Sequence, residues 1–154
     1  MLAFCIGSSG QRLVLTDEVL AHFDRHRQVL FRQPEAGGQL FAHFSDVDIV
    51  VIEATGPRST DRRTRTRYEP DSKAEQREID ERFTRGLHFV GDWHTHAERH
   101  PSPSGLDLRS TADGFNRSRH TLSAFVLILV GQDPFPHGLR VLLHDGNTCV
   151  TLTP

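Results

Sequence analysis

The sequence predicts an α/β fold, a single domain in which a central mixed β-sheet is flanked by about three helices. Short runs rich in Val, Ile, Leu and Phe, each bounded by turn residues, recur along the chain, and segments with helical periodicity lie between them. The most apolar run, residues 121–130, is typical of a central strand buried on both faces. A chain of 154 residues is long enough to bury the core of one such domain.

The first third of the chain predicts two hairpins separated by a helix. A GSSG turn joins the strands of the first hairpin, and Ser45-Asp46 joins those of the second. Between the hairpins, Thr16 supplies a cap, and the apolar side chains that follow recur at helical spacing until Pro34. We therefore expect strands at residues 2–6, 11–15, 39–44 and 47–54 and a helix at residues 16–32.

The rest of the chain predicts two more helices and further strands. Residues 55–70 are polar, rich in arginine and bounded by prolines, so we expect an exposed loop there. A charged helix should follow this loop, and another should begin at Ser104 after a proline-rich segment. The expected helices are residues 72–85 and 104–115, and the expected strands are residues 87–96, 121–130, 138–145 and 147–152.

Composition argues against several classes of function. With 18 basic and 20 acidic residues, the chain has no overall field that would attract nucleic acid or anionic lipid. The N-terminus lacks the features of a secretory signal, and residues 122–130 are too few to cross a bilayer. Cys5 and Cys149 are far apart and form no CxxC motif, so we expect free, buried thiols. These features predict a cytoplasmic protein without a nucleic-acid or membrane partner.

The stretch from His94 to Asp107 carries the most informative chemistry. His94 and His96 are separated by one residue in an expected strand, so their imidazoles face the same way. Asp107 offers a carboxylate at the start of the next helix, and Ser104 offers a hydroxyl beside it. Three protein ligands leave one coordination position for water, which zinc acidifies into a nucleophile near neutral pH. The pattern therefore indicates a hydrolytic zinc site.

Each part of this pattern also has a simpler interpretation. An HxH pair is weak evidence in a chain with 10 histidines. Ser104 and Asp107 have the spacing of a helix capping box, which explains both residues without a metal. The two interpretations are compatible, because a cap at Ser104 places Asp107 in the first helical turn. We expect His100 at the surface, since a fourth ligand would displace the water, and Trp93 in the core.

The complete spacing, His-x-His followed by Ser104 and Asp107, resembles the signature of the JAB/MPN domain metalloproteases, or JAMM proteases. The resemblance implies a JAB/MPN fold with a cytidine-deaminase-like layout and one zinc ion per chain, bound by His94, His96 and Asp107. It also implies that the Ser104 hydroxyl stabilises the oxyanion and that an upstream glutamate acts as the general base. Many members have proline after the second histidine, where this chain has Ala97.

Two glutamates are candidates for the general base. Glu35 lies between the first expected helix and the next strand and precedes a run of small residues, which resembles the family context. Glu53 lies at the end of the following strand and does not match that context. The resemblance favours Glu35 and leaves Glu53 as the alternative. Outside a catalytic role, Glu35 would be a solvated loop acid and Glu53 a surface carboxylate.

Within the family, the chain is similar to small bacterial JAB-domain peptidases of anti-phage cyclic-oligonucleotide operons and integrative elements. The similarity rests on ATGP at residues 54–57, the arginine-rich stretch after it and GDWHTH at residues 91–96. It implies an isopeptidase or endopeptidase acting at the C-terminus of a ubiquitin-like or nucleotidyltransferase partner with a conjugated or extended tail. The alternatives are a non-catalytic scaffold, against which the intact ligand set argues, and a zinc hydrolase of small-molecule amides.

Arginines concentrate in residues 55–70. Guanidinium groups hold carboxylates well, so Arg65 and Arg67 are candidates to dock the target protein or its tail beside the zinc. The alternative is a solvated loop whose charge is balanced by the neighbouring acidic residues. The arginines of this stretch are Arg58, Arg62, Arg63, Arg65 and Arg67.

Overall fold

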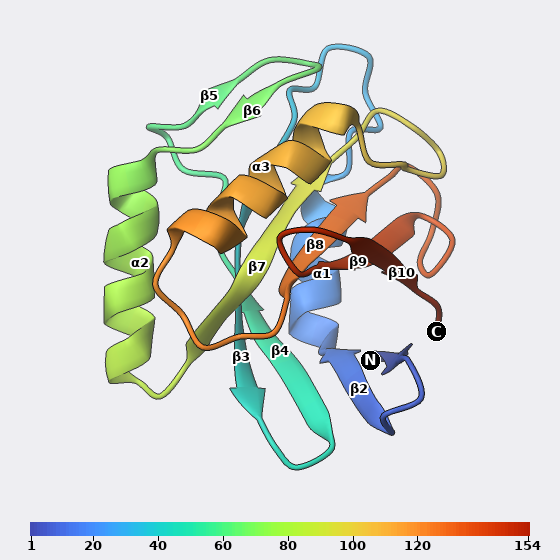
Figure 1. The fold of residues 1–154 in the computed structure, drawn as a ribbon. Helices are drawn as coiled ribbons and strands as arrows, with labels where there is room; N and C mark the ends of the chain where they lie inside the picture. Colours follow the sequence, from blue (N-terminus) through green and yellow to red (C-terminus); the bar gives the residue numbers. More distant parts are fainter.

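The computed structural model describes residues 1–154 and confirms the α/β fold class, with a mixed sheet and three helices (Figure 1). The helices are α1 (Asp17–His26), α2 (Ser72–Thr84) and α3 (Gly105–Arg117). The strands are β1 (Leu2–Ile6), β2 (Gln11–Leu15), β3 (Gly37–Phe44), β4 (Asp48–Ala54), β5 (Arg62–Arg63), β6 (Tyr68–Glu69), β7 (His88–Thr95), β8 (Phe125–Val130), β9 (Leu139–His144) and β10 (Cys149–Leu152).

Eight of the strands form one sheet in the order β1-β2-β4-β3-β7-β8-β9-β10. The pairs β2–β4 and β7–β8 are parallel and the other pairs are antiparallel. The sheet curves until its two edges approach each other, where the Cys5 amide donates to the Thr153 carbonyl at 3.4 Å. The remaining strands, β5 and β6, form a separate hairpin. This hairpin lies at the end of β7 at which α3 begins (Figure 1).

The helices cover the two faces of the sheet unequally. Helix α1 buries Val19 and Phe23 in the main apolar core, which contains side chains from most of the strands. Helix α3 packs against β8 and β9 on the other face, and α2 packs against β7 and β3. Strand β8 is buried along its whole length, as expected for a central strand covered on both sides. Helix α2 fully buries none of its residues, and it is held against the sheet partly by the ion pair of Arg82 with Glu53 of β4.

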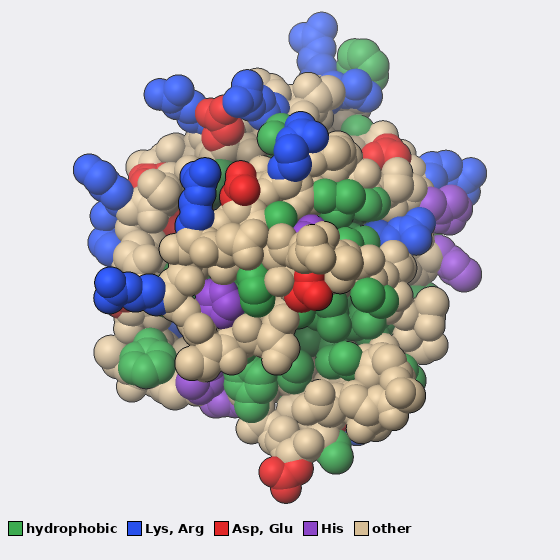
Figure 2. All heavy atoms as spheres, viewed as in Figure 1, with side chains coloured by type: hydrophobic (Ala, Val, Ile, Leu, Met, Phe, Trp, Pro, Cys, Tyr) green, Lys and Arg blue, Asp and Glu red, His purple; other side chains and the backbone are tan.

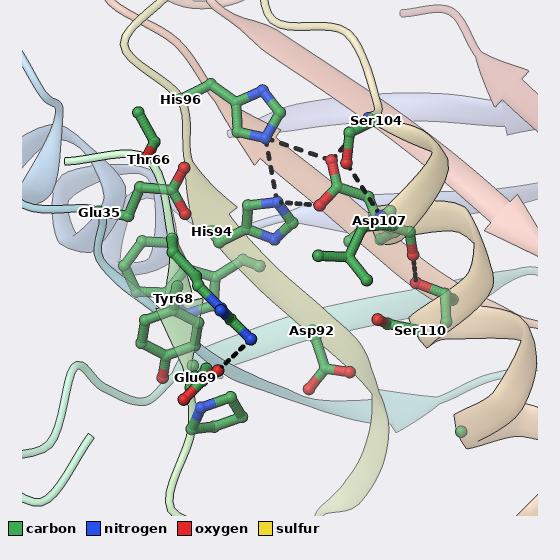
Figure 3. Close-up of a pocket in the computed structure, with 18 of the residues that line it drawn as sticks. Glu35, Thr66, Tyr68, Glu69, Asp92, His94, His96, Ser104, Asp107 and Ser110 are labelled. Atoms are coloured by element: carbon green, nitrogen blue, oxygen red, sulfur yellow. Dashed lines mark hydrogen bonds and ion pairs between the residues drawn. The ribbon is translucent and has the colours of Figure 1, made fainter. Parts of the chain in front are cut away.

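Strand β7 contributes to both faces because its side chains alternate. Trp93 is fully buried in the main core beside α1, as the sequence predicted, and its indole N–H donates to the Thr55 carbonyl at 2.8 Å. Thr95 is also fully buried on this side. His94 and His96 face the opposite side, toward the start of α3 (Figure 3). The alternation of side chains along the strand therefore places both histidines at the site and the residue between them in the core.

The first helix is shorter than its periodicity predicts, and residues 27–32 form a loop. Gln28 leaves the helical path because its amide is buried in tertiary hydrogen bonds, donating to the carbonyls of Gln33 and Arg65. The apolar side chains that follow are therefore not packed, and Phe31 is 77% exposed. Tertiary hydrogen bonds at Gln28 have overridden the local helical pattern.

The exposed loop expected at residues 55–70 is wrong in part, because this segment contains the β5–β6 hairpin and a buried ionic cluster. The side chain of Asp61 has no exposed surface. Its carboxylate accepts hydrogen bonds from the Tyr68 hydroxyl and from the amides of Arg58 and Asp71, each at 2.8 Å. Arg58 also pairs with Glu78 of α2. These bonds give the segment a defined shape, while Arg62, Arg65 and Arg67 remain exposed.

Two smaller expectations change. Both cysteines are free, but Cys5 is exposed and Cys149 is half-buried, because each lies in a strand at an edge of the sheet. Strand β8 starts at Phe125 rather than at residue 121. No helix of the structure has both the length and the apolar surface needed to span a bilayer.

Candidate metal centre

Two imidazoles and one carboxylate converge at the end of β7. The Nε2 atoms of His94 and His96 are 3.1 Å apart. The Asp107 carboxylate lies 3.1 Å from Nε2 of His94 through Oδ1 and 3.3 Å from Nε2 of His96 through Oδ2 (Figure 3). The three side chains are partly buried and offer one ligand atom each within 4.8 Å of one another. The three residues that the sequence proposed as ligands therefore meet in space.

This donor set fits zinc. Bonds of about 2.1 Å in a tetrahedral site place neighbouring ligand atoms roughly 3.4 Å apart, close to the separations between these side chains. Three protein ligands are also the number that leaves a fourth position open. The Nδ1 atom of His96 lies 2.8 Å from Oε1 of Glu98. Such a carboxylate fixes the imidazole tautomer and ring orientation that present Nε2 to a metal.

The first turn of α3 fixes the position of Asp107. Ser104 is the N-cap, and its Oγ accepts a hydrogen bond from the Asp107 amide at 3.0 Å. In return, the Asp107 Oδ2 accepts a hydrogen bond from the Ser104 amide at 2.8 Å. The capping box expected from the sequence is thus present, and it aims the carboxylate at the two histidines. The Ser104 hydroxyl donates no hydrogen bond within the chain, so its proton is available to a ligand.

Glu35 is held beside the centre by the segments on either side of it. Its amide donates to the Thr64 carbonyl at 2.8 Å, and its carbonyl accepts from Nε of Arg63 at 2.6 Å. The next residue, Ala36, donates from its amide to Oγ1 of Thr95 at 2.9 Å. The residue is only 9% exposed, and its carboxylate points toward His94 and His96 (Figure 3). Thr95, between the two histidines, therefore ties the Glu35 segment to the ligand strand.

Glu53 lies elsewhere. Its carboxylate pairs with Arg82 at 2.6 Å and with Arg85 at 3.4 Å, both at the end of α2. It does not line the cavity that contains the histidines, whereas Glu35 does. Of the two glutamates that the sequence left open, the structure places only Glu35 at the centre.

Electrostatic interactions tune the site. Burial raises the pKa of Glu35 to about 7, and the charge of His96 counteracts part of that rise. Burial alone would raise the pKa of Asp107, but hydrogen bonds with His94 and His96 hold it far below its usual value. For His96, burial opposes the charged form, and the hydrogen bonds with Asp107 and Glu98 outweigh it and raise the pKa. The centre therefore combines an ionised Asp107 carboxylate with a second carboxyl, Glu35, whose pKa is about 7.

The centre opens into a cavity of about 770 Å³. Arg65 and Arg67 of the hairpin line one side of it, as does Tyr68. Nε of Arg65 donates to the Phe31 carbonyl at 2.5 Å, and its guanidinium lies over the Phe31 ring. Arg67 pairs with Glu69. Figure 2 shows basic side chains gathered around this end of the molecule, with a few acidic ones among them.

Sequence reasoning missed three residues that shape the site. Glu98 supports His96, and an HxHxE spacing was the available signal. Thr95 supplies the buried link to Ala36, but a threonine between two histidines carries no distinctive signal. Asp92 lines the cavity on the same face of β7 as the histidines, and the period of the strand could have placed it there. His100 is exposed, as expected.

The chain shares its sequence pattern with a described family. The model for prokaryotic homologs of the JAB domain matches residues 16–141. The chain belongs to this family. The match confirms the resemblance seen in the signature, and it extends from the first helix to β9.

Several curated proteins are similar to this chain over half of its length or more. A protein named CD-NTase/cGAS isopeptidase from Vibrio cholerae is 30% identical over 126 residues, which cover 80% of this chain and 78% of the relative. A protein of the same name from Escherichia coli is 27% identical over 132 residues, covering 84% and 82%. A probable metalloprotease, y4qB, from Sinorhizobium fredii is 35% identical over 80 residues, about half of each chain.

Solved structures show the same fold at low sequence identity. Protein DSY2949 from Desulfitobacterium hafniense has a TM-score of 0.65 at 16% identity, with 90% of this chain and 88% of that chain covered. A protein from Salinibacter ruber has a TM-score of 0.53 at 21% identity, covering 90% and 87%. The α/β architecture is therefore shared well beyond close sequence relatives.

Proposed function

We propose that this JAB-family protein is a zinc-dependent isopeptidase that hydrolyses an amide or isopeptide bond at the C-terminus of a protein partner. One observation carries the proposal. Two imidazoles and a carboxylate converge within 4.8 Å, and a second, buried carboxyl, Glu35, lines the same cavity. This arrangement combines a three-ligand metal site with a proton carrier, which amide hydrolysis requires.

His94, His96 and Asp107 would hold the zinc ion. When bound, zinc supplies Lewis acidity that polarises the scissile carbonyl and makes water a stronger acid. Glu35 accepts a proton from the attacking water as the new carbon–oxygen bond forms. It then delivers this proton to the departing nitrogen as the carbon–nitrogen bond breaks, giving a carboxylic acid and an amine. A pKa of about 7 suits a group that must both take up and release a proton near neutral pH.

The Ser104 hydroxyl is suited to stabilise the developing oxyanion. Its oxygen already accepts the cap hydrogen bond from Asp107, so the hydroxyl is held in place while its proton remains free. A donor fixed before the reaction stabilises negative charge without reorganisation. Replacing Ser104 with alanine should therefore lower turnover more than zinc content.

The proposed substrate is a nucleotidyltransferase or a ubiquitin-like protein joined to a target through its C-terminal tail. The V. cholerae and E. coli relatives are named for such an activity, CD-NTase/cGAS isopeptidase, and the tail of a conjugate could enter the open cavity. Arg65 and Arg67 at the rim would dock the folded partner or its tail, since guanidinium groups pair with carboxylates.

Zinc analysis combined with matched glutamate variants tests the chemistry. The protein purified without added metal should contain about one zinc per chain. Glu35→Gln should keep this zinc and lose cleavage of a CD-NTase conjugate by about a thousandfold, because the proton carrier is gone. Glu53→Gln is the control, and it should retain both zinc and activity. A protein without zinc affinity, or a Glu35→Gln variant of full activity, would contradict the proposal.

A charge-reversed hairpin tests the docking role. Arg65→Glu combined with Arg67→Glu should raise KM for the conjugate while kcat and zinc content change little. Unchanged KM would show that these arginines do not bind the partner. Cleavage of small amides with no cleavage of any protein conjugate would instead favour a small-molecule hydrolase.

A further inference from the structure

The cavity at the metal centre continues along β7 into a second cavity. The second cavity has a volume of about 830 Å³ and lies between α2 and the C-terminal half of α3. Both cavities are lined by Glu75, Asp92 and Gly114, so together they form one groove that passes the metal ligands. The groove is open because α2 buries none of its residues and because α3 presents the small residues Ser110 and Gly114 to it.

Asp92 lies at the junction of the two cavities, on the floor of the groove. It precedes His94 by two residues on β7, so both side chains project from the same face of the strand. Its carboxylate accepts no hydrogen bond and forms no ion pair within the chain, and Figure 3 shows it facing the same space as Ser110. A carboxylate at the bottom of a groove without a partner is costly unless a ligand supplies one.

The wall of the groove beside Asp92 carries a second acid, while Arg117 and Arg119, which form no ion pair, line only the second cavity. Glu75 of α2 lines both cavities, and its carboxylate also has no hydrogen-bond or ion-pair partner. Arg58 lines neither cavity, and its guanidinium is engaged by Glu78, with Nε donating to Oε1 at 2.6 Å. The junction of the two cavities therefore presents two carboxyl groups that have no basic partner within the chain.

We propose that Asp92, with Glu75 beside it, forms a specificity subsite that binds a lysine or arginine side chain of the substrate next to the scissile bond. The inference rests on the proposed function, because it places an extended tail in the groove. Strand geometry puts the Asp92 backbone about 7 Å from that of His94, the span of two extended residues. The basic residue should therefore lie within about two residues of the cleaved bond.

Peptide selection on the intact protein tests this subsite without requiring turnover. The probe is a random nonapeptide library passed over the immobilised, zinc-loaded Glu35→Gln protein, and the retained peptides are sequenced by mass spectrometry. The same selection is made with Asp92→Asn and with Asp113→Asn, each in the Glu35→Gln background. Asp113 lies on α3, is exposed and lines neither cavity, so its variant removes the same charge outside the groove.

The expected result is enrichment of lysine and arginine at one peptide position, reduced about tenfold by Asp92→Asn and unchanged by Asp113→Asn. Peptide libraries cleaved by the protein with native Glu35 should show the same preference beside the cleaved bond. Equal selection by all three proteins, or no preference for basic residues, would overturn the subsite. Loss of zinc binding or of all hydrolysis would instead refute the proposed function, while the selection would still report on the groove.

Discussion

Replacing Thr95 with valine should damage the site without touching a proposed ligand. Thr95 is fully buried, and its hydroxyl makes two hydrogen bonds. Oγ1 accepts from the Ala36 amide at 2.9 Å and donates to Oε1 of Gln28 at 2.8 Å. Valine has nearly the same shape, so the change removes these bonds and creates no cavity. Both former partners are also buried and would be left unsatisfied.

The magnitude follows from those two groups. A buried donor or acceptor left without a partner costs about 1–3 kcal/mol, so the two groups together should lower the free energy of unfolding of Thr95→Val by roughly 2–6 kcal/mol. For a chain of this size, that loss lowers Tm by roughly 4–24 °C. Because Ala36 follows Glu35 directly, activity should fall more than tenfold by the loss of Glu35 positioning. Zinc content should stay unchanged, since His94 and His96 remain on β7.

Thermal unfolding, zinc analysis and a cleavage assay below Tm measure these three effects. Thr151→Val is the matched control, because Thr151 is exposed on β10 and its hydroxyl makes no hydrogen bond within the chain. Similar Tm values for the two variants would refute the assignment of a structural role to the Thr95 hydroxyl. A destabilised Thr95→Val protein with normal activity would refute the link to Glu35.

Three further changes have defined outcomes. Glu98→Gln should weaken zinc binding by about 10–100-fold, measured by competition with a chelator, and unchanged affinity would show that His96 is oriented without it. In the metal-free protein, the folded state holds a Glu35 proton that the unfolded chain releases near pH 4.5, so the unfolding free energy should fall as pH rises to about 7. Glu35→Gln should remove this loss, which amounts to roughly 3 kcal/mol above pH 7. Urea titrations of both proteins measure it, and parallel pH profiles of their unfolding free energies would contradict the shift. Asp61→Asn should speed proteolysis within residues 55–70 because the hairpin loses its buried anchor, whereas an unchanged rate would show that the anchor is dispensable.

The three proposed metal ligands could be predicted from the sequence because their spacing follows from local geometry. The two-residue period of β7 places His94 and His96 together, and the capping box places Asp107 in the first turn of α3. Neither feature depends on contacts far along the chain. The hairpins and the central strand could likewise be expected from apolar runs and turn residues.

Features that depend on distant contacts were not available from the sequence. The end of α1 depends on Gln28, whose bonds reach Arg65 and Thr95. The defined structure of residues 55–70 depends on the buried side chain of Asp61, which accepts hydrogen bonds from residues later in the chain. The choice between Glu35 and Glu53 needed the pairing of β3 with β7, which brings Gly37 opposite His94. Local patterns in the sequence say little about such pairings.

Trp93 is positioned to serve as an intrinsic fluorescence probe of the site. It is the only tryptophan of the chain, so fluorescence excited selectively in indole is emitted from a single known position. That point lies directly behind the two histidines, on the opposite side of the same strand, and the ring packs against Phe23 and His22 of α1. A change at the histidines that shifts β7 should alter the emission of this indole. Occupancy of the centre could then be followed in real time on unlabelled protein.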